Sequence, residues 1–294
     1  MPDISGALWS ADLLTKQPAL ITRAHKDYFA AGANIAITAS YQASVPGLVK
    51  QLAISEDEAK ALIKKSVELA QEARAAFLKE NSERGGRDGP ALLVAGSVGP
   101  YATLLADGSE YRGDYVVEHE AMKDFHRGRI EALISANVDV LACETMPSFP
   151  EIRALAQLLQ EEFPTQESYF SFTVQSATHL SDGTALADVV KVLEKCEHVV
   201  AVGVNCVQQD VALAALEELA RLTSKPLVVY PNSGETWNHE TRDWEGQSTE
   251  GAGWKERTRQ YWDAGARMIG GCCRTTPEDI RVIAETWRDI TREG

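Results

Sequence analysis

Three cysteines stand at the ends of two apolar segments that lie far apart in the sequence. Cys206 ends the segment VVAVGVNC, and the neighbouring Cys272 and Cys273 end the segment ARMIGGCC. Three thiolates suit a catalytic zinc ion, which keeps its fourth position open for another ligand. The glycines at positions 270 and 271 give the backbone enough freedom for both neighbouring thiols to face one ion. The alternative is that all three are small buried hydrophobic residues, and residue type and position leave both interpretations open.

A carboxylate and a polar loop end two further apolar segments. Glu144 closes the run LACE, where a buried carboxylate is costly unless a cation or a ligand partners it. The ammonium group of an amino acid is one candidate partner, and a salt bridge to a neighbouring loop is the other. Residues 230–235, YPNSGE, follow another such run. They either hold a carboxylate group or form an ordinary turn.

The other two cysteines and the histidines are not expected to take part in chemistry. Cys143 directly precedes Glu144, so strand alternation turns it away from whatever Glu144 faces, and Cys196 lies late in a helical segment. We interpret both cysteines as packing residues. The six histidines, such as His126 and His179, lack the spacing of metal ligands, and we interpret them as surface residues.

A regular array of strands and helices must position these side chains. Seven short apolar runs rich in β-branched residues are each followed by a segment of helical periodicity, which predicts a parallel sheet covered by helices. The runs are residues 34–40, 91–98, 138–145, 169–174, 199–206, 226–230 and 266–273. Helix starts are marked by Ser55 with Glu58, by Asp210, and by Thr276 with Asp279.

Such an array forms either a closed barrel or an open doubly wound sheet. The open sheet predicts a Gly-rich phosphate turn, and no G-x-G-x-x-G motif occurs. We therefore expect an α/β fold, a (βα)8 TIM-type barrel that spans residues 1–294 as a single domain. The carboxyl ends of its strands, with the three thiols, would form the active-site face. Because seven strands are visible where a barrel has eight, we expect the first strand to be missing, with a gap between the runs at 34–40 and 266–273.

Composition limits the class of partner. No window of 18 apolar residues and no secretory signal pattern is present, so we expect no membrane association and a cytoplasmic location. Asp and Glu outnumber Lys and Arg by 43 to 29, and the net charge of −14 opposes binding to nucleic acid or anionic membranes. Five cysteines in an intracellular chain indicate thiolate or metal chemistry rather than a disulfide framework.

The cysteine motifs resemble those of the homocysteine S-methyltransferase family. GVNC at 203–206 and GGCCRTTPEDI at 270–280 carry this resemblance. The members that use S-methylmethionine are the closer match, and the similarity extends from about residue 8 almost to the end of the chain. The motifs shared with them are TASYQAS (38–44), GSVGPY (96–101), LADGSEYRGDY (105–115), LACET (141–145), LSDGT (180–184) and VVYPNSGE (228–235).

The resemblance implies roles for individual residues. Cys206, Cys272 and Cys273 would bind zinc, and homocysteine would supply its sulfur as a further ligand. Glu144 would hold the substrate ammonium, and the segment DGSEYRGDY would cover the methyl-donor side. The residues implied to line the amino-acid pocket are Thr38, Asn205 and Ser233.

The resemblance also implies an activity, the transfer of a methyl group from S-methylmethionine, or less efficiently S-adenosylmethionine, to homocysteine to give methionine. A coordinating cation ionises a thiol, which can then attack the methyl group of a sulfonium. Betaine is a further candidate donor. Members of the family carry an Asp-Gly strand before the segment ALWSADLL, and we expect this chain to lack it. The alternative function is therefore a truncated, weakly active or inactive relative that binds zinc or thiols and has a regulatory role or no catalytic role.

Overall fold

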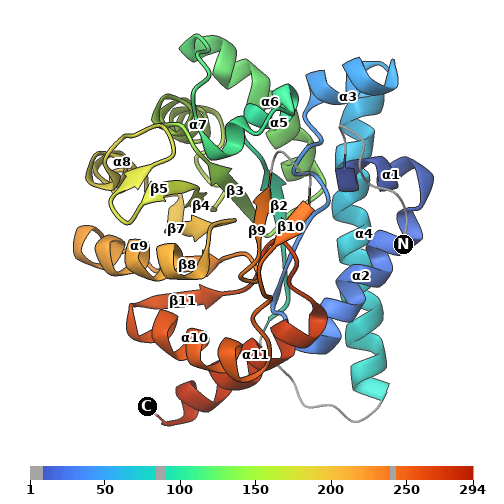
Figure 1. The fold of residues 1–294 in the computed structure, drawn as a ribbon. Helices are drawn as coiled ribbons and strands as arrows, with labels where there is room; N and C mark the ends of the chain where they lie inside the picture. Colours follow the sequence, from blue (N-terminus) through green and yellow to red (C-terminus); the bar gives the residue numbers. More distant parts are fainter. Residues whose placement is uncertain (1–8, 84–90, 239–242, 294) are drawn as a thin grey trace.

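Seven parallel strands form one sheet in the computed structural model, which describes residues 9–83, 91–238 and 243–293. Each strand pairs with its neighbours in chain order, so the sheet curls like the wall of a barrel (Figure 1). The predicted α/β barrel fold and all seven predicted strands are confirmed. The strands are β1 (Ile35–Ile37), β2 (Leu93–Val98), β3 (Val140–Met146), β4 (Ser168–Phe172), β7 (Val199–Asn205), β8 (Leu227–Tyr230) and β11 (Ala266–Ile269).

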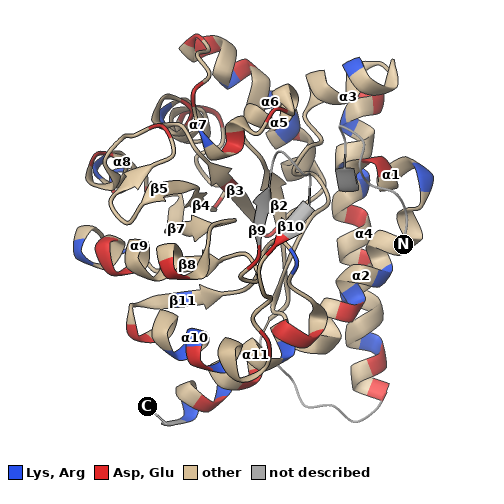
Figure 2. Cartoon of the chain, in the orientation of Figure 1, with Lys and Arg blue, Asp and Glu red and all other residues tan. Residues whose placement is uncertain are grey.

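Helices cover the outer face of the sheet, and Figure 2 shows that most charged residues lie on them. Among the described residues, no helix is both long enough and apolar enough to cross a membrane. The α-helices are α1 (Leu13–Lys16), α2 (Pro18–Ala31), α3 (Val45–Leu52), α4 (Glu56–Glu83), α5 (Ala102–Leu105), α6 (His119–Ser135), α7 (Phe149–Glu162), α8 (Leu186–Leu193), α9 (Gln209–Leu222), α10 (Ala252–Asp263) and α11 (Pro277–Glu293).

Short elements lie in the loops, where neither apolar runs nor helical periodicity predicted them. Two of them are short 3-10 helices, and the other four are strands that form two small antiparallel hairpins. They are η1 (Trp9–Asp12), η2 (Ser109–Tyr111), β5 (Val174–Ser176), β6 (His179–Leu180), β9 (Thr236–Asn238) and β10 (Asp243–Glu245).

Two of the three predicted helix starts are confirmed. The backbone N–H of Ser55 donates to Glu58 at 2.8 Å, and that of Thr276 donates to Asp279 at 2.8 Å, as in a capping box. Asp210 is wrong as a cap, because α9 already begins at Gln209. Its carboxylate instead forms an ion pair with Arg257 on α10.

The sheet separates two hydrophobic clusters because side chains alternate between its faces. The larger cluster packs the outer face against the helices. The smaller cluster fills the inside of the curl with side chains from successive strands. Its buried members are Ala95, Val140, Ala142, Tyr169, Ala201, Val228 and Tyr230.

The first and last strands of the sheet, β1 and β11, lie at its two edges. Within the described residues β1 pairs with β2 alone and β11 with β8 alone, which confirms the expected gap. A cavity of about 1040 Å³ lies between them. Its lining includes Ile35 and Ile37 of β1, and Met268 and Ile269 of β11. The gap therefore exposes two strand edges and apolar side chains that an eighth strand would cover.

We predict that an N-terminal extension carrying an Asp-Gly strand raises the melting temperature of this chain by roughly 5–10 °C. The reason is that pairing both edges and filling the cavity contributes a few kcal/mol, and 1 kcal/mol corresponds to about 2–4 °C in a domain of this size. Differential scanning calorimetry measures the change. A Gly-Ser extension of equal length is the control, and equal melting temperatures for the two extensions would contradict the prediction.

Candidate metal and substrate site

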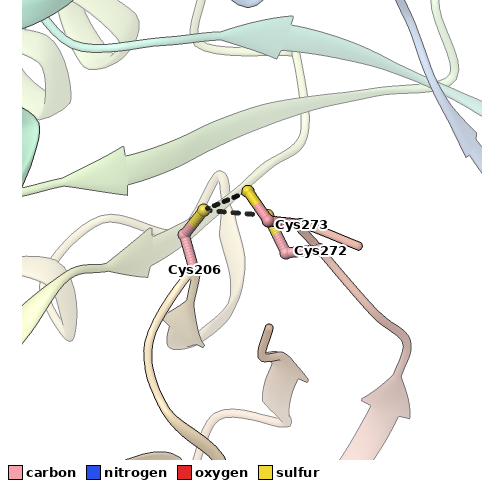
Figure 3. A group of neighbouring side chains, drawn as sticks. All are labelled: Cys206, Cys272 and Cys273. Atoms are coloured by element: carbon pink, nitrogen blue, oxygen red, sulfur yellow. Dashed lines mark hydrogen bonds between the residues drawn. The ribbon is translucent and has the colours of Figure 1, made fainter. Parts of the chain in front are cut away.

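The three predicted metal-ligand sulfurs lie together at the carboxyl end of the sheet (Figure 3). The Sγ of Cys206 lies 2.9 Å from that of Cys272 and 3.5 Å from that of Cys273. All three lie within 4.8 Å of one another. Three sulfurs bound at about 2.3 Å around one tetrahedral zinc ion are about 3.8 Å apart. The separations therefore require only small side-chain movements to hold an ion.

Pairing through β8 brings the two cysteine segments together. The N–H of Cys206 donates to the carbonyl of Tyr230 at 3.1 Å, and the N–H of Cys272 donates to that of Pro231 at 2.8 Å. Both cysteine segments are therefore positioned by hydrogen bonds to the carboxyl end of β8, which lies between them. A side chain at Gly203 would meet the Val228 carbonyl oxygen at 1.7 Å, so β7 and β8 approach this closely only with glycine there.

Unusual backbone turns aim the thiols inward. Cys206 has a φ of 56° and Arg274, directly after Cys273, has a φ of 66°, in the left-handed region that non-glycine residues rarely adopt. Such strained conformations persist only where surrounding contacts enforce them. Arg274 is held by a two-pronged ion pair with Glu235, at 3.1 and 3.2 Å. This ion pair ties the loop after β11 to the loop after β8.

The electrostatics of the three thiols favour a bound cation. A hydrogen bond from Cys206 lowers the pKa of Cys273, whereas hydrogen bonding to Cys206 and burial raise the pKa of Cys272. Without a cation, neighbouring thiolates repel each other, so only part of the set ionises. The helices α9 and α11 begin within four residues of Cys206 and Cys273, and their N-termini favour negative charge. The donor set fits a soft divalent metal such as zinc.

Glu144 is buried, 7% exposed, near the end of β3. Its carboxylate accepts hydrogen bonds from the Oγ of Ser97 and, at 3.1 Å, from the hydroxyl of Tyr230. Burial raises the pKa of Glu144 to about 7, although both hydrogen bonds favour the charged form. Among the described residues, no ion pair within 4.0 Å is formed by Glu144, so the alternative of a salt bridge to a neighbouring loop is not supported.

Thr38 belongs to a hydroxyl network that supports Ser97. Its Oγ1 lies 2.7 Å from the Oγ of Ser40 and accepts the N–H of Ser97 at 3.0 Å. Ser40 in turn donates to the Ser97 carbonyl at 2.9 Å. The buried Thr38 side chain therefore orients the hydroxyl that contacts Glu144.

Asn205 holds the backbone beside Glu144. Its Oδ1 accepts the N–H of Thr145, and its Nδ2 donates to the Oγ1 of Thr145, both at 2.8 Å. Thr145 has a φ of 60°, which is strained for a β-branched residue. The amide of Asn205 thus stabilises the irregular end of β3 that directly follows Glu144.

Ser233 connects the loop after β8 to the cysteine pair. Its N–H donates to the carbonyl of Cys273 at 3.1 Å, and its Oγ donates to Glu235 at 2.9 Å. Ser233 is fully buried. All seven side chains singled out as metal ligands or pocket residues therefore lie at the carboxyl ends of the strands.

Sequence reasoning missed other polar residues of this site. Tyr230 and Ser97, which contact Glu144, lay within the motifs YPNSGE and GSVGPY without being singled out. Tyr111 on η2 places its hydroxyl 3.8 Å from the Sγ of Cys206. His126 and His198 are wrong as surface residues, because both are buried, and His126 lies 2.7 Å from a carboxylate oxygen of Glu151. Helical periodicity and residue spacing in the sequence could not predict this contact between His126 on α6 and Glu151 on α7.

The comparisons with known proteins agree with this arrangement. The sequence profile described as "Homocysteine S-methyltransferase" matches residues 2–287. The chain belongs to the homocysteine S-methyltransferase family. It is 51% identical over 281 residues to the homocysteine S-methyltransferase of Escherichia coli, covering 96% of this chain and 88% of that protein. It is 45% identical to homocysteine S-methyltransferase YbgG of Bacillus subtilis, covering 98% and 90%.

A solved structure of the family has the same fold. It is the metallated form of the Escherichia coli homocysteine methyltransferase MmuM, with a TM-score of 0.85 and 49% identity. The match covers 97% of this chain and 90% of that one. The chain is accordingly an enzyme of the methyltransferase class. That a relative binds metal supports testing the three sulfurs of this chain directly.

We predict that the reduced chain binds about one divalent metal ion and that Cys206→Ser abolishes this binding, because two remaining thiols cannot complete the three-sulfur set. Elemental analysis after gel filtration measures the metal content. Cys196→Ser is the matched control, since this buried cysteine lies outside the cluster and should retain the ion. Unchanged metal content in Cys206→Ser would exclude this site.

Proposed function

We propose that this chain is a zinc-dependent enzyme that transfers a methyl group from S-methylmethionine to homocysteine and gives methionine. The observation that carries the proposal is the convergence of three sulfurs next to a buried carboxylate whose hydrogen bonds come from neutral hydroxyl groups. Cys206, Cys272 and Cys273 would hold the zinc ion. When bound, zinc supplies the positive charge that keeps the sulfur of homocysteine ionised at neutral pH.

The reaction needs little acid–base chemistry from the protein. The homocysteine sulfur donates an electron pair to the methyl carbon, and the bond from that carbon to the sulfonium sulfur breaks. The leaving sulfur keeps the bonding pair and becomes a neutral thioether, so it needs no proton. The thiol proton of homocysteine is released to solvent. The main work of the side chains is therefore to bind both substrates and align them.

Glu144 would bind the ammonium group of homocysteine. A buried carboxylate that lacks a cationic partner is costly, and a substrate ammonium compensates it on binding. Ser97 and Tyr230 orient the carboxylate, and Asn205 holds the strained backbone of Thr145 beside it. Thr38 and Ser233 would complete the amino-acid pocket, Thr38 through Ser97 and Ser233 through the loop of Cys273.

The decisive experiment incubates the zinc-loaded chain with homocysteine and one donor at a time, and measures methionine. We expect turnover with S-methylmethionine, slower turnover with S-adenosylmethionine and none with betaine. Cys206→Ser should be inactive with every donor. Zinc and homocysteine binding without any methionine formed would instead support the alternative of a catalytically inactive zinc- and thiol-binding relative.

We predict that Glu144→Gln weakens homocysteine binding about 10- to 100-fold, the equivalent of a lost hydrogen bond to a charged group. Zinc content should stay at the wild-type level, because the sulfurs remain. Isothermal titration with homocysteine, together with elemental analysis, separates the two effects. Loss of zinc with unchanged homocysteine affinity would show that Glu144 does not contact the ammonium.

We predict that homocysteine affinity falls as the pH is lowered through about 7, because protonation of Glu144 removes the charge that pairs with the ammonium. Tyr230→Phe removes a hydrogen bond that favours the carboxylate, so it should move this inflection to higher pH. Binding titrations between pH 5.5 and 8.5 on zinc-loaded protein measure the profile. An inflection that is identical in Tyr230→Phe would assign the titration to another group.

A further inference from the structure

A buried charged cluster lies beside the site and takes no part in the proposed chemistry. Glu151, in the first turn of α7, is fully buried. Its carboxylate lies 2.7 Å from the Nε2 of His126 and accepts the N–H of Tyr101 at 2.6 Å and the hydroxyl of Tyr115. Burial raises the pKa of Tyr115, so its hydroxyl stays protonated and donates. One carboxylate thus gathers groups from three separate segments.

Arg129 extends the cluster towards the ends of β1 and β2. It is fully buried and donates to the carbonyls of Tyr41, at 3.0 Å, and Gly99. It also donates to the Nδ1 of His126 at 3.1 Å, so the imidazole carries its proton on Nε2 and donates that proton to Glu151. Burial lowers the pKa of His126, which keeps the ring neutral. Arginine, neutral histidine and carboxylate therefore form one continuous hydrogen-bonded chain.

The segment 109–115 joins this cluster to the sulfurs. At one end, the hydroxyl of Tyr111 lies 3.8 Å from the Sγ of Cys206. Next to Tyr111, the carbonyl of Glu110 accepts the hydroxyl of Thr173 at 2.7 Å. At the other end, Tyr115 donates to Glu151. The segment is thereby held across the carboxyl ends of the strands.

A buried cluster of charged and polar side chains contributes little to the free energy of unfolding. Burying an arginine and a carboxylate costs desolvation energy that their attraction barely repays, and apolar side chains of similar volume often do as well. Its hydrogen bonds instead fix the direction of each partner. The partners are the loops after β1 and β2, through Tyr41, Gly99 and Tyr101, and the segment that carries Tyr111.

We propose that Glu151 and Tyr115 are positioning residues that hold segment 109–115 over the three sulfurs, so that Tyr111 forms a wall of the methyl-donor pocket. This assignment rests on the proposed function, which places the donor opposite the homocysteine sulfur. Loss of the hydrogen bond between Tyr115 and Glu151 would let Tyr111 move away from the three sulfurs. It leaves the cysteine cluster and the pocket around Glu144 intact, because neither contacts Glu151 or Tyr115 in the part of the chain that the structure describes.

The test uses Tyr115→Phe, which removes one hydroxyl group, and Glu151→Gln, which removes the charge at nearly constant shape. We expect the KM for S-methylmethionine to rise about tenfold in each, the equivalent of one hydrogen bond to a charged group, with zinc content and homocysteine affinity unchanged. Tyr261→Phe is the matched control. Its buried hydroxyl donates to the carbonyl of Gln209 at 3.3 Å, on α9 and α10, away from the segment.

A second measurement does not depend on activity. Arg112 lies inside the segment with a half-exposed side chain, and trypsin can cleave after it only when the local backbone opens. We expect cleavage at Arg112 to accelerate about tenfold in Tyr115→Phe and Glu151→Gln and to stay at the wild-type rate in Tyr261→Phe. Should Glu151→Gln fail to fold, Tyr115→Phe alone decides.

The outcomes separate this proposal from the proposed function. If no donor yields methionine but cleavage at Arg112 accelerates, the function fails and the anchoring of the segment stands. If the wild-type chain is active while cleavage and donor KM in the variants match those of Tyr261→Phe, the cluster is merely structural and the proposal is overturned. Loss of zinc or of homocysteine affinity in Tyr115→Phe overturns it as well.

Discussion

The rest of the site depends on the approach of three sulfurs across a sheet in which their strands are not neighbours. β7 and β11 are separated by β8, so their axes are about 9.6 Å apart at normal strand spacing. Sulfur atoms 2.9 and 3.5 Å apart can be reached from there only if both chains turn inward as they leave the sheet. The left-handed conformations of Cys206 and Arg274 and the ion pair between Arg274 and Glu235 provide these turns. The strain at the strand ends is thus the cost of bringing the three sulfurs together.

The site concentrates acidic groups, and among the described residues none forms an ion pair with Glu144 within 4.0 Å. The thiols and Glu144 lie at one end of the sheet, and hydroxyl groups rather than ammonium or guanidinium groups contact Glu144. Three positively charged species can satisfy such a pocket, namely a metal ion, a substrate ammonium and a sulfonium. Each is held by charge attraction in a partly dehydrated space, where that attraction is stronger than in water. In the proposed reaction a sulfonium donor would become neutral after transfer, so the product would lose part of the attraction that held the donor.

The sequence predicted the framework and the clustering of the three thiols better than the contacts around them. Apolar runs followed by helical periodicity predicted all seven strands, because burial on both faces leaves a local signal. The cysteines were found because three thiols at strand ends are rare and chemically distinctive. His126 and Glu151 were missed, because their partners come from separate helices and no local pattern encodes that contact. Asn205 is predicted to line the pocket, and its amide also forms two hydrogen bonds with Thr145, which only the irregular backbone of β3 at that residue could show.

The position of the cysteine pair at the open edge of the sheet links metal occupancy to local order. β11 has a strand neighbour on one side, and Cys272 and Cys273 follow it directly. An ion held by these two thiols and by Cys206 ties the edge strand to β7, past the intervening β8. Thermodynamic linkage then requires the ion to stabilise the folded edge, by about 2.7 kcal/mol when its free concentration is 100 times its dissociation constant. In the proposed function the ion that ionises the homocysteine sulfur would therefore also hold the last βα unit in place, so metal depletion would lower both the resistance of that unit to unfolding and the methyl-transfer activity.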